Sequence, residues 1–328
     1  MRLPPFPSRR AGDPEDPRLR SAFCRAFLRS GDGEAAARRA GVSRRTAATL
    51  ARRLLSEEAI WQEIEELRGE ERYADSGLYR PPPEPLCAAL YHCCVQKIAS
   101  QWLKAVFQDP AFFRATGLRV RPFVQLGHRL ARRPGEMPHG TLLTHLYIDR
   151  RSFQALPKPA DHRWFFVQRD PRDALLSWYH SARSSHVAVA PIPSLRARLL
   201  TMDFATGLGF LIERLMEWGY FESLAGWSEV PLGEGRFRYE DLARDERRFL
   251  HALFTSLSVP LPPAEIDALA ARHSFERLSG GRAKGVEDTS SHYRIGKPGH
   301  WRQILPGDVL ERLRLVTDGL AERLGYSD

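Results

Sequence analysis

The sequence has no long hydrophobic run. No uninterrupted apolar stretch approaches the ~20 residues that a membrane-spanning helix needs. The amino-terminal MRLPPFPSRR also lacks the apolar core of a secretory signal peptide. The sequence therefore predicts a cytoplasmic protein without a membrane partner.

Cysteines are few, and the usual nucleotide and metal motifs are absent. The four cysteines, Cys24, Cys87, Cys93 and Cys94, have no metal-ligand spacing, which favours buried, reduced thiols. No His, Asp or Glu pattern indicates a metal site. A GxxxxGK[ST] phosphate loop is missing as well, which makes an ATP-using kinase or NTPase the weaker alternative.

What the chain does have is size and positive charge. Its 328 residues, 43% of them hydrophobic, suffice for one large α/β domain and a small second one. The formal net charge of +9 comes mainly from arginine. Such an excess favours polyanionic partners, and nucleotide phosphates and nucleic acid both fit.

Composition divides the chain into four parts. We expect a disordered lead-in at 1–17, a helical domain at 18–79, a stiff proline linker at 80–85 and a large domain at 86–328. In the helical domain, helices at 34–40 and from Ser43 to about Leu55 are joined by a glycine-bearing turn. This is the helix-turn-helix arrangement.

The helical domain has a steep charge gradient. Residues 18–56 hold ten arginines and two acidic residues, a net +8, whereas residues 57–75 have a net charge of −6. The segment GEAAARRAGVSRRTAATLARRLL resembles the helix-turn-helix domains of phage terminase small subunits. Three roles stay open: DNA contact through Arg44, Arg45 and Arg52, a helical appendage whose arginines are solvated or paired, and self-association into a homo-oligomer.

The large domain is organised around Trp164–His180. Trp164–Gln168 suits a buried strand of a parallel sheet, and Asp170 and Pro171 suit the start of a helix. In that helix we expect an inward set and a polar set: Ala174, Leu175 and Trp178 inward, and Arg172, Asp173 and Ser177 outward. A strand that feeds a helix through a tight turn presents backbone N–H groups to an anion.

Three more stretches accompany this element: VQKIASQWLKAVF at 95–107, TLLTHL at 141–146 and HYRIGKPGHW at 292–301. In this order, the set resembles the cytosolic-type sulfotransferases that use 3′-phosphoadenosine 5′-phosphosulfate (PAPS), over roughly residues 86–325. The resemblance implies an α/β fold, a three-layer, P-loop-like parallel sheet flanked by helices. It implies PAPS as co-substrate, no metal, and in-line sulfonyl transfer to a hydroxyl or amine of a small-molecule or carrier-bound acceptor.

The resemblance also assigns roles to single residues. Lys97 stabilises the leaving phosphate, and His145 is the general base for the acceptor. The nucleotide contacts are divided among Ser100 and Gln101 at the 5′ end, Trp102 and Tyr239 near adenine, and Arg169, Ser177, Arg294 and the Gly296 backbone at the 3′-phosphate.

The sequence departs from the family pattern at four positions. Ile98 and Ala99 replace a small serine and a glycine, Leu143 stands where a lysine is frequent, and His300 replaces an aspartate. Two alternatives therefore stay open. One is a catalytically weakened nucleotide-binding protein whose helix-turn-helix binds DNA, and the other is a phosphoryl-transfer enzyme.

Overall fold

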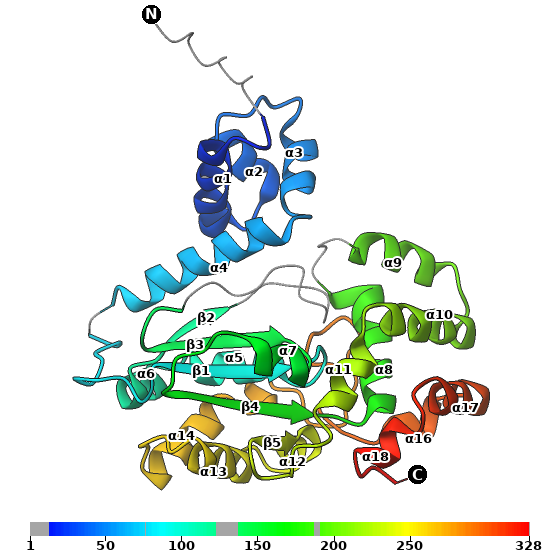
Figure 1. Cartoon of the computed structure of the whole chain (residues 1–328). Coiled ribbons are helices and arrows are strands. Elements are labelled where there is room, and N and C mark those ends of the chain that lie inside the picture. Colours follow the sequence, from blue (N-terminus) through cyan, green and yellow to red (C-terminus); the bar gives the residue numbers. More distant parts are fainter. Residues whose placement is uncertain (1–12, 76, 123–136, 187–190, 328) are drawn as a thin grey trace, which may run out of the picture. The chain divides into compact units, whose positions relative to one another are not determined.

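The computed structural model describes residues 13–75, 77–122, 137–186 and 191–327 (Figure 1). These residues form two compact units. The first unit comprises the described residues up to Ala74 together with Pro191, and the second comprises those of 75–187 and 192–328. Within the described ranges, no helix is both long and apolar enough to cross a membrane.

The first unit is a small bundle with its own hydrophobic core. Its helices are α1 (Pro17–Ser30), α2 (Gly33–Arg39), α3 (Ala47–Leu54) and α4 (Glu58–Tyr73). Asp16 caps α1 by accepting from the Arg18 N–H, and Phe23 and Leu54 are fully buried in the core. The helices expected around 34–40 and up to Leu55 are thus present as α2 and α3.

The turn between α2 and α3 is tight. Gly41 has φ +91°, a conformation that L side chains rarely adopt, and Val42 is buried. The Ser43 carbonyl accepts from the Ala47 N–H at 3.0 Å. This bond closes a single turn. The helix α3 itself begins at Ala47 with Thr46 as its N-cap, later than the predicted start at Ser43, and Arg44 and Arg45 lie in the turn before it.

The second unit is built on a five-stranded parallel sheet, which confirms the predicted α/β fold. The strands are β1 (Ala89–Cys94), β2 (Arg119–Pro122), β3 (Thr141–Tyr147), β4 (His162–Gln168) and β5 (Arg236–Arg238), in the order β2-β3-β1-β4-β5. Both neighbours of β1 follow it in the chain but lie on opposite sides of it. In open parallel sheets, ligands bind beyond the carboxyl ends of strands at such a switch point.

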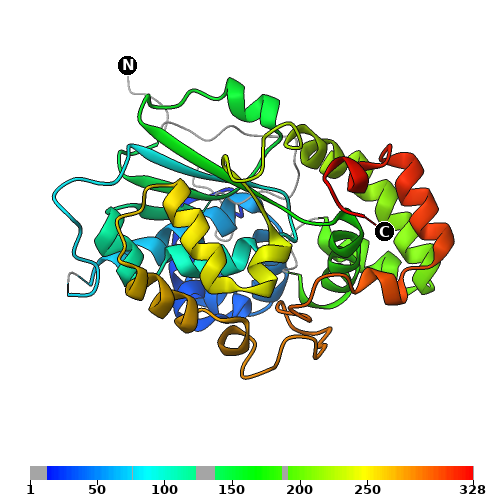
Figure 2. The same cartoon turned by 90° about the horizontal axis from the view of Figure 1, so that it is seen from below.

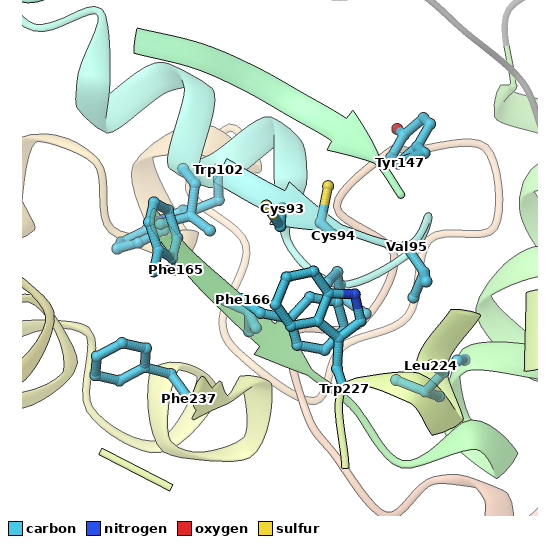
Figure 3. Close-up of a cluster of buried hydrophobic side chains, with 14 of the residues drawn as sticks. Cys93, Cys94, Val95, Trp102, Tyr147, Phe165, Phe166, Leu224, Trp227 and Phe237 are labelled. Atoms are coloured by element: carbon cyan, nitrogen blue, oxygen red, sulfur yellow. The ribbon is translucent and has the colours of Figure 1, made fainter. Parts of the chain in front are cut away.

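Helices cover both faces of the sheet because the side chains of β4 alternate between them. Trp164 and Phe166 pack against Trp227, the latter with stacked rings 4.8 Å apart (Figure 3). Phe165 points to the other face and contacts Phe107, with ring centroids 5.7 Å apart. The result is the predicted three-layer arrangement of helix, sheet and helix.

Fourteen α-helices of the second unit follow or flank these strands among the described residues. They are α5 (Ser100–Phe107), α6 (Pro110–Thr116), α7 (Arg150–Ala155), α8 (Pro171–His180), α9 (Ile192–Leu200), α10 (Phe204–Glu217), α11 (Tyr220–Gly226), α12 (Tyr239–Arg244), α13 (Glu246–Ser256), α14 (Pro263–Arg272), α15 (Phe275–Leu278), α16 (Trp301–Ile304), α17 (Gly307–Val316) and α18 (Leu320–Arg323). A π-helical turn, Ser181–Ser185, extends α8. Figure 2 shows α13 and α14 on the side of the sheet seen from below.

The apolar spacing of residues 194–218 and of residues 306–324 suits one helix each, but in the structure each segment is broken in two. Residues 194–218 form α9 and α10, because Asp203 caps a new helix by accepting from the Thr206 N–H at 3.0 Å. Residues 306–324 form α17 and α18, with Gly319 at φ +59° between them. The apolar spacing runs on through both breaks, so it does not reveal them.

The proline-rich segment 80–85 packs against the rest of the second unit. The Gly117 position approaches Pro85 and Pro82 so closely that an added Cβ would lie 3.1 Å and 3.2 Å from their atoms. The Leu86 N–H donates to the Thr116 carbonyl at 2.7 Å. These contacts hold the chain that enters β1, and the four-part domain division remains a prediction.

Candidate functional site

The loop after β1 begins the site. Lys97 and Ala99 both adopt positive φ, +70° and +64°, which is uncommon for residues with a Cβ. The Gln96 carbonyl accepts from the Tyr220 hydroxyl at 3.0 Å. The loop ends at Ser100, the first residue of α5, so the helix amino terminus faces the same region.

The loop after β4 is the second part of the site. Buried Arg169 donates to the Lys97 carbonyl at 2.9 Å, which ties the two loops together. Its guanidinium lies 4.2 Å from the centre of the Tyr239 ring. Asp170 starts α8 by accepting from the Arg172 N–H at 2.9 Å, in agreement with its predicted capping role.

Two charged residues of α8 are buried, although the sequence pattern placed them on its polar face. Arg172 is 5% exposed: it pairs with Asp170 at 3.0 Å, donates to the Ser327 carbonyl at 2.9 Å and lies over the Trp301 ring. Asp173 is 1% exposed and accepts from the Gly299 and Trp301 N–H groups. Partners distant in the chain bury both, so their expected exposure was wrong.

Asp173 thereby anchors the glycine-rich segment 280–301, which we call the lid segment. Ser177 is one helical turn from Asp173, so the two share a face of α8. Arg282 holds the lid segment together from within, because it donates to the carbonyls of Val286 at 2.7 Å and Arg294 at 2.6 Å.

Three cations from three separate segments converge here: Lys97, Arg169 and Arg294. Burial, followed by the charges of Arg169 and Arg294, lowers the pKa of Lys97 from 10.5 to about 7. Burial and Arg169 also lower the pKa of Arg294, although Glu287 acts in the opposite direction. Positive charge gathered where water has little access is suited to binding an anion.

A family model described as the sulfotransferase domain matches residues 142–325. The chain belongs to the sulfotransferase domain family. The matched region begins in β3 and ends beyond α18, so it includes β4, α8 and the lid segment. The loop after β1, which contains Lys97, lies before the matched region.

Solved structures similar to this sulfotransferase include mouse sulfotransferase SULT7A1 complexed with PAP. It is 16% identical, covers 78% of this chain and 92% of its own, and has a TM-score of 0.49. Another is retinol dehydratase in complex with androsterone and inactive cofactor PAP. It is 16% identical, the alignment covers 80% of this chain and 87% of the retinol dehydratase chain, and the TM-score is 0.44. A comparison with curated proteins gives no match.

His145 lies in β3 of the sulfotransferase unit, opposite the stretch of β1 between Tyr91 and Cys93. The pairing of β1 with β3 is in register up to Tyr91–Leu143 and then shifts by one residue. This shift places His145 in a bulge, partly exposed, with its ring 5.4 Å from the Tyr147 ring. The bulge re-aims a side chain at the edge of the site, as bulges near active sites do.

Behind His145 lies His92, a residue that the sequence interpretation missed. Its Nδ1 is 2.8 Å from the Thr144 hydroxyl, and its ring stacks on Phe165 at 4.6 Å. Burial, and then the neighbouring His145, lower the pKa of His92 well below the usual value. The sequence did contain a signal for His92, because a histidine stands out inside the apolar run LCAALYHCCV.

Of the two proposed adenine contacts, Trp102 is buried and Tyr239 is half-buried. Trp102 is 5% exposed, packs edge-on against Phe249 and donates to the His273 carbonyl at 2.6 Å. Tyr239 is the first residue of α12, and its ring lies under the guanidinium of Arg169. Their predicted contact with adenine stays a prediction.

Two lid positions have defined environments. Gly296 has φ +61°, and a Cβ there would lie only 2.5 Å from the Phe275 ring, so packing as well as backbone conformation requires glycine. His300, which replaces the family's aspartate, accepts from Arg294 at 3.3 Å. Asp173 on α8, which the sequence interpretation left without a role, provides the lid anchor.

Proposed function

We propose that this protein transfers the sulfonyl group of PAPS to a hydroxyl or amine by in-line displacement. The observation that carries the proposal is the convergence of Lys97, Arg169 and Arg294 beyond the carboxyl ends of β1 and β4. A nucleotide with anionic groups at its 3′ and 5′ ends needs cations of this kind at two points. The resemblance of the motifs supports PAPS as that nucleotide.

At the 5′ end, Lys97 neutralises the charge that develops on the bridging oxygen as the sulfur–oxygen bond breaks. Ser100 and Gln101, in the first turn of α5, donate to the phosphate, where the helix dipole also favours negative charge. Because the anhydride already contains its leaving group, positioning and charge neutralisation are the main tasks of the protein.

At the 3′ end, Arg169 and Arg294 hold the phosphate, with Ser177 and the Gly296 N–H as further donors. Arg294 is paired with Glu287. The 3′-phosphate takes the place of that carboxylate as the partner of Arg294. Arginine suits this role because its planar fork stays protonated even among other cations.

His145 accepts the proton from the acceptor as its oxygen or nitrogen attacks sulfur. The new bond forms to sulfur while the bond to the bridging phosphate oxygen breaks, and PAP leaves as the phosphate anion. Partial exposure of His145 in β3, the strand next to β1, supports this assignment.

The test is calorimetric titration of the full chain with PAP, with adenosine 5′-monophosphate and with ATP. We expect PAP to bind tightest, because it alone has a 3′-phosphate. Arg294→Ala should weaken PAP binding about tenfold or more, the range for hydrogen bonds to charged groups, and leave the monophosphate unaffected. Arg302→Ala, which removes an exposed arginine from the adjacent helix, is the matched control.

ATP binding as tight as PAP binding would instead support the phosphoryl-transfer alternative. A PAP-binding protein should then be screened against hydroxyl and amine acceptors with radiolabelled PAPS. If the label stays on the nucleotide or appears only as free sulfate, and no acceptor is labelled, the result would favour a catalytically weakened nucleotide-binding protein.

A further inference from the structure

The first unit has an arginine-rich surface that sulfonyl transfer does not use. Arg38, Arg39, Arg44, Arg45 and Arg52 are all exposed. None of these five has an ion pair with any residue in the described part of the chain. Between Ala35 and Ser56 the sequence has no acidic residue to oppose them.

Most acidic residues of this unit lie in or next to a different helix, α4. Residues 57–75 have a net charge of −6, and most of them form α4, which lies against α1 (Figure 1). The Phe27 ring of α1 and the Trp61 ring of α4 are 5.7 Å apart. Arg20 of α1 pairs with Glu57. Arg20 has two ion pairs, with Glu15 and Glu57, and Arg53 also pairs with Glu15. These pairs do not involve the five arginines named above, whose charge stays uncompensated.

One face of α3, together with the turn that precedes it, combines charge with small size. On α3, Ala47, Leu50, Ala51 and Leu54 face the core, which leaves Ala48, Thr49 and Arg52 exposed. Arg45 is exposed in the preceding turn, seven residues before Arg52. The exposed side chains between these two arginines, Thr46, Ala48 and Thr49, are all small.

We propose that the first unit binds duplex DNA with this face of α3 in the major groove. The major groove, about 12 Å wide, admits a helix, and small side chains between the arginines permit close approach. Arg45 and Arg52 contact phosphates or base edges inside the groove, and Arg38, Arg39 and Arg44 neutralise the adjoining backbone. The tight turn at Gly41 orients α2 relative to α3, as in helix-turn-helix proteins.

The experiment measures fluorescence anisotropy of a labelled, mixed-sequence DNA duplex of about 25 base pairs with the full chain. We expect binding that weakens steeply as salt rises, because each neutralised phosphate contributes about 0.9 to the slope of log K against log salt. Arg45→Ala with Arg52→Ala should weaken binding at least about tenfold and reduce that slope by about two.

The matched control is Arg25→Ala with Arg29→Ala. Both arginines are exposed on α1, and their removal changes the net charge of the same unit by the same amount. A groove-bound α3 predicts less than about threefold loss for this pair. Equal losses for the two pairs would mean diffuse attraction to charge and would overturn the proposal.

Ala48→Phe tests the close approach without changing charge. Because Ala48 is exposed, the added ring leaves the core of the unit intact, which a thermal melt verifies. We expect DNA binding to fall about tenfold for a helix seated in the groove. Unchanged binding contradicts the proposed geometry.

Two further comparisons separate DNA from other polyanions. Duplex RNA of the same length should bind more weakly, because its major groove is too narrow for a helix. Equal or tighter RNA binding, or displacement of DNA by polyglutamate at equal charge, overturns the assignment. Lys97→Ala should leave DNA binding unchanged, so failure of the nucleotide-site proposal and failure of this one are distinguishable.

Discussion

The loops after β1 and β4 meet at one edge of the sheet but are held in different ways. The loop after β4 is fixed by protein contacts: Asp170 pairs with Arg172, and Asp173 binds two lid N–H groups. The loop after β1 instead holds two non-glycine residues, Lys97 and Ala99, at positive φ. The loop after β4 is therefore preorganised by protein contacts, whereas the loop after β1 keeps backbone strain and an unfavourably placed cation, Lys97.

This difference suggests a division of labour between the two ends of the nucleotide. A preorganised 3′ end provides binding energy at low entropic cost. A strained 5′ end with a destabilised ammonium gains most when negative charge develops beside it. The predictions below test whether the two loops contribute to binding and to turnover in this unequal way.

The largest effect is expected for Lys97→Ala. Removing a positioned charge from the leaving group should lower kcat by about a hundredfold or more, the range seen for single transition-state donors. PAP affinity should fall much less, because Arg169 and Arg294 remain. Single-turnover rates and calorimetry on the same variant separate the two quantities, and equal losses would contradict the division of labour.

The second prediction addresses the loop after β4 through Asp173→Ala. Loss of this buried carboxylate leaves the Gly299 and Trp301 N–H groups without their acceptor, at a cost of about 1–3 kcal/mol. PAP affinity should therefore fall about tenfold to a hundredfold, with kcat less affected. Asp241→Ala, which removes an exposed carboxylate paired with Arg244, is the control and should change neither quantity.

The sequence predicted the scaffold and the cations because both depend on local patterns. The apolar run Trp164–Gln168 is a buried strand, and the motifs containing Lys97, Arg169 and Arg294 mark three segments that do converge. In each case, residue type and nearby spacing contained the information.

The roles of Arg172 and Asp173 could not be obtained in this way. Helical periodicity treats a charged side chain as exposed, yet their partners, Ser327 and the Gly299–Trp301 backbone, lie more than a hundred residues away. The break between α17 and α18 was missed for a similar reason, since the apolar spacing continues through it.

The third prediction uses the pKa of Lys97, which burial and the charges of Arg169 and Arg294 lower to about 7. A bound dianion favours the protonated amine, so the pKa of Lys97 must rise on binding. PAP affinity should then be highest below pH 7 and fall by up to tenfold for each pH unit above it, until the pKa of the complex is reached. Below pH 7 the amine is already protonated and this dependence disappears.

Calorimetry at pH 8 in two buffers with different ionisation enthalpies measures the expected uptake of up to about one proton. Lys97→Met removes the titrating amine, and with it the uptake. Unchanged uptake in that variant would assign the proton to another group.

The smallest effect is expected for Ala99→Gly, which tests strain in the loop after β1. Alanine at φ +64° costs about 1–2 kcal/mol, whereas glycine adds about 0.5–1 kcal/mol of chain entropy to the unfolded state. The free energy of unfolding should therefore rise by about 0.5–1 kcal/mol. Ala105→Gly, in the interior of α5, makes the same chemical change where φ is helical, and should lower that free energy by about 1 kcal/mol. Opposite signs in urea unfolding would locate the strain at Ala99, and a loss in both variants would refute it.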